Sequence, residues 1–395
     1  VYISSDSSGN FNLGLLNKEK EPGDTSTFNW LNPEIDWNGM EVRLSNLDLA
    51  FFRPDRNKRM VVHLDSLLTK TERTLRGITT DSELAAFVSG IAFNTDKGKF
   101  LEKSALSGQL KIKNDKGVWS LEQTDLRIRG ETYTCAAELK TGVYKGLQLR
   151  VESPVAHYDS MTGLLPEELR EELKKYHVSD RFYVSANICS NLVRGDEPEI
   201  DIGFTLAGND VRINEFPFRE VHTRGVFVNQ LATAEGGIPG SKKNFRIELD
   251  TSRGHQGPLS LRMPRAVVRG VVGDTYLEAP IRITGPAREI NERVGTENFI
   301  FGPGRFSLST RVNASLNSMP GIIQSSEGKL TLLNARVLYK PAGVSFPLRS
   351  LVLNKRGEDI RFKLESGELS TGFDFEMAGK IDNILPLLLE RPADS

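Results

Sequence analysis

The sequence predicts an all-β protein, in which an elongated, curled and mainly antiparallel sheet forms an open groove beside one short helix. Three observations support this fold class. Apolar and polar residues alternate with a period of two in many segments, clusters of turn residues separate these segments, and only one stretch has helical periodicity. Alternation gives every strand one polar and one apolar face. A single helix cannot cover so many apolar faces, so the sheet either leaves a groove or packs as a β-sandwich, the alternative fold.

Composition limits the possible functions. The chain has 395 residues, with 51 Lys and Arg against 52 Asp and Glu, and a net charge of -1. This balance argues against a nucleic-acid partner, which normally requires a basic excess. No apolar run approaches the roughly 18 residues that span a membrane. Because residue 1 is Val, we expect a piece of a longer protein whose membrane anchor lies outside this sequence.

The first part of the chain reads as consecutive strands. Residues 1–12 form a strand, and residues 42–51 form two runs whose parity changes at Ser45 and Asn46, which predicts a β-bulge. Residues 79–93 are ambiguous, because Asp81 could cap a short helix whereas the end of the segment resembles a strand. The other expected strands are residues 61–68, 108–113, 119–123, 126–130, 132–140 and 146–158.

A helix is expected over residues 166–176. Pro166 suits a first helical position, acidic residues follow it, and Lys174 and Lys175 lie near the expected end. An apolar stripe at helical spacing consists of Leu165, Leu169 and Leu173.

Strands resume after this helix. They are expected at residues 182–188, 200–206, 226–231, 245–249, 259–272, 276–283, 306–316, 330–339, 351–354, 360–365 and 372–381. We therefore predict a first part of the groove in residues 1–160, a helical connector in residues 161–177 and a second part in residues 178–395, together forming one continuous unit.

Residues that could perform chemistry are sparse. The five histidines are scattered without metal-ligand spacing, and neither Gly302–Arg305 nor Gly236–Lys242 has the spacing of a cofactor or phosphate loop. We expect no metal and no cofactor. Cys135 and Cys189 are interpreted as ordinary strand thiols, although a disulfide between them stays open.

One acidic cluster keeps an enzymatic alternative open. Glu199 and Asp201 could act as paired acids of a carbohydrate-active β enzyme, although a solvated strand entry is the favoured interpretation. We favour a protein that is not an enzyme.

The parity of the strands assigns side chains to the apolar face. A lipid-binding groove would use Leu147, Leu149, Val151, Phe245, Ile247, Leu249, Leu259, Leu261, Phe306, Leu308, Val312, Ile360, Phe362, Leu364, Phe373 and Phe375. The alternative is that these residues pack in a dry core between two sheets.

Several hairpin-like segments resemble a known family. They are Asn10–Leu13 with the following charged loop, residues 42–49, residues 93–101, residues 195–201 and, most closely, residues 328–389. Together they resemble the AsmA family of bacterial envelope proteins, related to TamB and YhdP, in its Bacteroidetes forms. The resemblance covers most of the chain, but it rests on hairpin signatures and not on reactive residues.

The resemblance implies a periplasmic body, anchored in the inner membrane by an N-terminal helix, with a sheet curled into a half-pipe. It further implies transfer of phospholipid, or a role in outer-membrane biogenesis, with phospholipid or another acyl lipid as partner. Membrane contact would be made through the segment missing from this chain. A structural or assembly protein of the envelope, with a filled β core and protein partners, is the alternative function.

Overall fold

A computed structural model describes most of the chain. The described residues are 2–4, 39–53, 57–74, 77–92, 95, 98–140, 146–191, 198–229, 245–270, 275–294, 298–315, 327–357, 359–366 and 376–382. They divide into two units, Val1–Gly203 and Phe204–Ser395, and each unit is described by itself. The predicted division at residues 161–177 stays a prediction.

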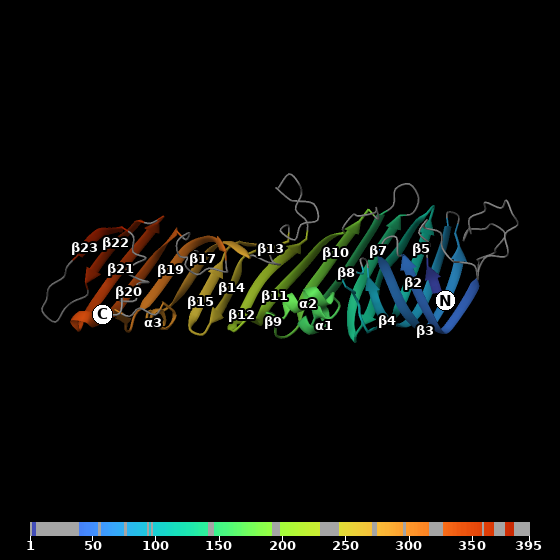
Figure 1. Cartoon of the computed structure of the whole chain (residues 1–395), viewed down its shortest axis with the longest axis horizontal. Helices are drawn as coiled ribbons and strands as arrows, with labels where there is room; N and C mark the ends of the chain where they lie inside the picture. Colours follow the sequence, from blue (N-terminus) through green and yellow to red (C-terminus); the bar gives the residue numbers. More distant parts are fainter. Residues whose placement is uncertain are drawn as a thin grey trace. The chain divides into compact units, whose positions relative to one another are not determined.

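The predicted fold class is confirmed. The described residues form an all-β structure in which almost every strand pair is antiparallel, with β1 and β2 as a parallel pair. Within either unit, the strands form one curled layer and not two facing sheets, so the sandwich alternative is wrong for the described residues (Figure 1). Three short α-helices are present among these residues, where the sequence predicted one.

The first unit is a meander. Each strand from β2 to β8 pairs with the next in chain order, and β10 returns to pair with β8. Its elements are β1 (Tyr2–Ser4), β2 (Met40–Arg53), β3 (Lys58–Arg73), β4 (Gly77–Ala92), β5 (Ser104–Asp115), β6 (Val118–Ile128), β7 (Glu131–Lys140), β8 (Gly146–Ala156), α1 (Tyr158–Thr162), α2 (Glu167–Leu173), β9 (Tyr176–Val178) and β10 (Phe182–Ser190). The strand β11 (Glu199–Ile213) contains the boundary between the units.

Two expectations about β2 and β4 are resolved. Asn46 has φ 52°, but β2 and β3 keep the same register on both sides of it, from the pair Ser45–Ser66 to the pair Leu47–Leu64. A β-bulge would place an extra residue on one strand, so the predicted bulge is not found in this pairing. The ambiguous segment at Asp81 is a strand, because β4 is hydrogen-bonded to strands on both sides.

The predicted helix is shorter than expected. α2 begins after Pro166 and ends at Leu173, and Tyr176–Val178 form β9, so the predicted end at Tyr176 is wrong. The sequence also missed α1, whose Tyr158 hydroxyl donates to the Leu173 carbonyl oxygen at 2.9 Å. This bond joins the two short helices.

The second unit is also antiparallel, but several of its strand pairs skip elements in chain order. Its elements are β12 (Phe216–Val228), β13 (Arg246–Leu249), β14 (Ser252–Gln256), β15 (Leu259–Met263), β16 (Ala266–Arg269), β17 (Tyr276–Pro286), α3 (Glu289–Val294), β18 (Phe299–Phe301), β19 (Arg305–Ser315), β20 (Glu327–Tyr339), the 3-10 helix η5 (Lys340–Ala342), β21 (Val344–Arg356), β22 (Asp359–Ser366) and β23 (Glu376–Asp382). The pairs that skip elements include β12 with β14, β13 with β16 and β17 with β19.

The single strand expected at residues 259–272 is wrong. It divides into β15 and β16, with Pro264 between them. Both segments pair with β17, β15 through residues 282–284 and β16 through residues 276–278. Pro280 lies between these two stretches of β17, where its missing N–H interrupts neither ladder.

Each unit has a small core beside its helices. In the first unit, Leu164 between α1 and α2 packs on the cluster that contains Tyr133. In the second unit, Ile290 of α3 packs with Phe306 and Leu332. In both units the helices lie at one end of the strands (Figure 1). The rest of each sheet is not covered by these helices.

Candidate functional site

The clearest candidate site is the apolar face of the second unit. One row of directly opposite residues crosses six neighbouring strands, β15, β17, β19, β20, β21 and β22, and contains only Leu, Ile and Phe side chains. We call it the central row, and it consists of Leu261, Ile283, Leu308, Leu330, Leu353 and Phe362. With about 4.8 Å between neighbouring strands, it extends over roughly 24 Å.

A second apolar row lies beside the central row. It crosses β19, β20, β21 and β22 and consists of Phe306, Leu332, Leu351 and Leu364. Residues two apart on a strand lie on the same face, so the two rows form one continuous surface of large apolar side chains. The row on the other side of the central row is mixed, with Thr310, Gly328 and Lys355 in its middle and Ile281 and Ile360 at its ends.

The other face of the same strands is polar. On β19 it presents Ser307, Ser309 and Arg311, and on β22 it presents Arg361 and Lys363. The sheet of this unit is therefore amphipathic, as the alternation predicted.

Burial of the apolar face is graded. Phe306 is 8% exposed and Leu332 is fully buried, because Ile290 of α3 belongs to the same cluster. All six members of the central row are only half-buried. Burial of an aliphatic side chain in a closed core normally removes nearly all of its exposure. The central row therefore keeps apolar surface that further hydrocarbon could cover.

The first unit has a related face. Leu44, Leu67, Leu84, Gly108, Leu126 and Tyr133 form a row across β2 to β7. Polar side chains interrupt the neighbouring rows, as at Thr69 and Ser82, whose hydroxyl oxygens are 3.0 Å apart. This face is apolar over a narrower band.

The structure places the predicted groove residues as follows. Phe373 and Phe375 lie outside the described residues. Buried among the others are Leu259, Phe306, Val312 and Ile360. Half-buried are Leu147, Leu149, Val151, Phe245, Ile247, Leu249, Leu261, Leu308, Phe362 and Leu364.

Pairing brings only part of this set together. Leu261, Leu308 and Phe362 belong to the central row. Leu147, Leu149 and Val151 lie on β8 of the first unit, opposite Leu139, Ala137 and Cys135. Ile247 pairs with Phe227 and Val268, while the ring of Phe245 meets that of Phe227 at 5.7 Å.

Sequence reasoning missed half of the central row. Ile283, Leu330 and Leu353 are adjacent to the predicted Leu308 in the ladder or one strand further. All three lie in segments expected to be strands, and the alternation of these segments could have placed all three on the apolar face. The register that aligns them across strands could not be read from alternation alone.

The polar candidates concern metal ligands, paired acids and glycine-containing loops. No group of three potential ligands gathers among the described residues. Glu199 and Asp201 are exposed on β11. Gly302 donates its N–H to the Arg336 carbonyl oxygen at 2.7 Å, so this glycine joins the end of the sheet. Gly236–Lys242 lie outside the described residues.

Both cysteines are free thiols, so the open disulfide is not formed. Cys135 is buried on the apolar face of the first unit, and its desolvation raises the pKa of the thiol to about 11. The thiol is therefore neutral at physiological pH, in agreement with its apolar surroundings.

Comparison with known proteins found no matching family model, curated protein or solved structure. Among the described residues, no helix combines the length and apolar character needed to cross a bilayer.

Proposed function

We propose that this chain binds the acyl chains of a lipid on the apolar face of its second unit. The central row is the observation that supports the proposal, because six adjacent strands present large, half-buried apolar side chains without a polar interruption. Its length of roughly 24 Å exceeds the roughly 15 Å thickness of one bilayer leaflet's hydrocarbon.

The energetics favour such a role. Exposing an acyl chain of roughly 16 carbons to water costs on the order of 12 kcal/mol, at about 0.8 kcal/mol for each methylene. A continuous apolar surface removes much of this cost without any reactive group. As part of the proposal, the chain shields lipid in transfer across the periplasm or in outer-membrane biogenesis, as an AsmA-like protein anchored in the inner membrane.

A charge placed in the central row tests the proposal. We expect Leu308→Asp to abolish binding of a fluorescent acyl probe, because lipid burial would desolvate the carboxylate. Asn313→Asp is the matched control, since it places the same group on the polar face of the same strand, and it should bind like the parent protein.

Folding is checked by circular dichroism for each variant. If Leu308→Asp does not fold, the smaller change Leu308→Ser should still weaken probe binding measurably. A folded Leu308→Asp variant that binds the probe as the parent does would count against an acyl site at this face.

A further inference from the structure

The polar face of the second unit carries a row of basic side chains. His222 on β12 is the ladder partner of Arg253 on β14, Arg253 of Arg262 on β15, and Arg262 of Arg282 on β17. We call these four residues the basic row. They lie on the face opposite the central row, because Leu261 and Ile283 immediately precede or follow Arg262 and Arg282 along their strands.

The basic row is not neutralised by carboxylates. Arg253, Arg262 and Arg282 are exposed, and no ion pair among the described residues involves them. Like charges directly opposite each other on neighbouring strands destabilise a sheet. In a chain with 51 basic and 52 acidic residues, three adjacent unpaired guanidinium groups mark a local excess that an anion would stabilise.

The neighbouring ladder row adds further hydrogen-bond donors. It contains His255, Ser260, Thr284 and Ser307, and again no carboxylate is a member. The acidic group of Glu220 lies beside this row, with its Oε2 3.9 Å from Nε2 of His255. Two adjacent rows thus present guanidinium, imidazole and hydroxyl groups toward the same side.

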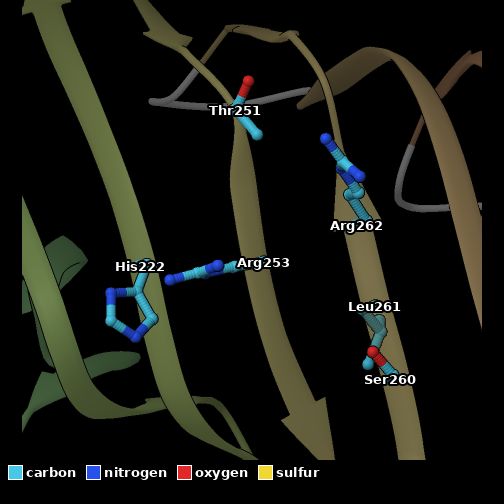
Figure 2. A pocket seen from close by; sticks show the side chains of 6 residues that line it. All are labelled: His222, Thr251, Arg253, Ser260, Leu261 and Arg262. Carbon is cyan, nitrogen blue, oxygen red and sulfur yellow. The ribbon is translucent and has the colours of Figure 1, made fainter.

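A cavity lies at this place. It has a volume of about 420 Å³ and is lined by His222, Thr251, Arg253, Ser260, Leu261 and Arg262. Figure 2 shows the Arg253 side chain extending from its strand toward His222, while Arg262 extends toward the end of β14 where Thr251 lies. The lining offers two guanidinium groups and the Ser260 hydroxyl, and it contains no acidic side chain. The Thr251 hydroxyl already donates to the Pro264 carbonyl oxygen at 3.2 Å.

We propose that this cavity is a binding site for a phosphate group. Guanidinium groups match phosphate oxygens in a bidentate geometry, and the Ser260 hydroxyl can donate to a remaining oxygen. The site does not depend on the proposed acyl-binding function, because the polar groups that would bind phosphate lie on the other face of the sheet, although Leu261 of the central row also borders the cavity. The phosphate could belong to a soluble ester or to the headgroup of a lipid in a membrane.

Calorimetry with pyrophosphate and with glycerol 3-phosphate tests the soluble source. Sedimentation with vesicles of phosphatidylcholine, with or without phosphatidylglycerol, tests the lipid headgroup. We expect Arg253→Gln and Arg262→Gln each to weaken binding about tenfold, because both side chains line the cavity. Arg262→Lys should lose less, because it keeps the charge.

Arg43→Gln is the matched control. It removes the same charge from the first unit, where Arg43 is already paired with Glu41 at 2.7 Å, and it should change binding by less than about twofold. Arg262-dependent binding of either the soluble esters or the anionic vesicles supports the site and identifies the source of the phosphate. Absence of binding to both, or an equal loss in Arg43→Gln, would overturn it.

Discussion

The apolar faces of the two units differ in whether they contain buried polar side chains. In the first unit, the apolar face buries Thr71, Ser82, Ser104, Asn114 and Ser153 among its aliphatic residues. In the second unit, the central row and the row beside it contain only apolar side chains.

This difference teaches that one sequence pattern gives two kinds of surface. Buried polar groups normally require hydrogen-bond partners. In the first unit, Ser82 bonds to Thr69 and Ser104 bonds to the Glu102 carbonyl oxygen, whereas Asn114 Oδ1 and Ser153 Oγ have no partner among the described residues. The two rows of the second unit contain no polar side chains, and the half-buried side chains of the central row suit a hydrocarbon partner. We therefore propose the acyl site for the second unit.

The largest expected effect concerns the part of the second unit's apolar face that packs against α3. Leu332 is fully buried, whereas Leu333 is 48% exposed on the other face. We expect Leu332→Ala to lower the free energy of unfolding by about 2–5 kcal/mol, because it leaves a cavity beside Phe306 and Ile290. Leu333→Ala should cost less than about 1 kcal/mol. Chemical denaturation measures both, and similar losses would contradict the assignment of the faces.

Cysteine reactivity reports on the first unit's face. Because burial raises the pKa of Cys135 to about 11, its thiolate is scarce at pH 8. We expect a maleimide to label Cys135 at least about tenfold more slowly than the half-buried Cys189, with the rate at Cys135 rising as the pH increases. Mass spectrometry of labelled peptides gives both rates, and equal rates would show that the face of the first unit is open to solvent.

Buried polar atoms without partners offer a stabilising change. Oδ1 of Asn114 and Oγ of Ser153 have no hydrogen-bond partner among the described residues. We expect Ser153→Ala to raise the free energy of unfolding by about 1 kcal/mol, because it removes an unsatisfied buried hydroxyl. Thr69→Ala, which breaks the bond to Ser82, should lower it. Thermal unfolding of the two variants distinguishes these signs.

In each unit the helices lie at one end of the strands, and the stability of these two ends should depend differently on pH. In the first unit, burial raises the pKa of Glu131, but hydrogen bonds from His157 outweigh burial and leave the pKa below its usual value. In the second unit, neutral Asn291 donates to the Phe301 carbonyl oxygen and accepts from its N–H, at 2.7 and 2.8 Å.

A carboxyl group with a lowered pKa in the folded state contributes stability above its unfolded pKa and loses that stability as the pH falls. We expect Glu131→Gln to destabilise the protein at pH 7 and to approach the parent as the pH falls below about 4.3. The deficit of Asn291→Ala should stay nearly constant with pH. Denaturation curves at several pH values test this contrast, and a constant deficit in Glu131→Gln would contradict it.

Much of the fold was readable from the sequence. Alternation identified the strands and their amphipathic character, whereas the bulge predicted from the parity change at Asn46 is absent from the pairing of β2 with β3. The division at Pro264 and the strand at Asp81 were not resolved, because both depend on which neighbours complete the ladder. Tertiary pairing decided what local patterns left open.

The candidate site was predictable only in part. Parity placed Leu308 and Phe362 on the apolar face, but the central row required the register of six strands. The basic row gave no sequence signal, since Arg253, Arg262 and Arg282 are separated along the chain and become neighbours only through pairing. Long-range register is the information that one-dimensional patterns lack.

The most direct test of the account is mass spectrometry of organic extracts from the purified chain, never exposed to detergent, beside a matched soluble control protein. The account predicts phospholipid or another acyl lipid in stoichiometric amount, reduced in Leu308→Asp and unchanged in Asn313→Asp. A folded chain without lipid would contradict it, and would favour a structural envelope protein whose apolar face packs against protein partners.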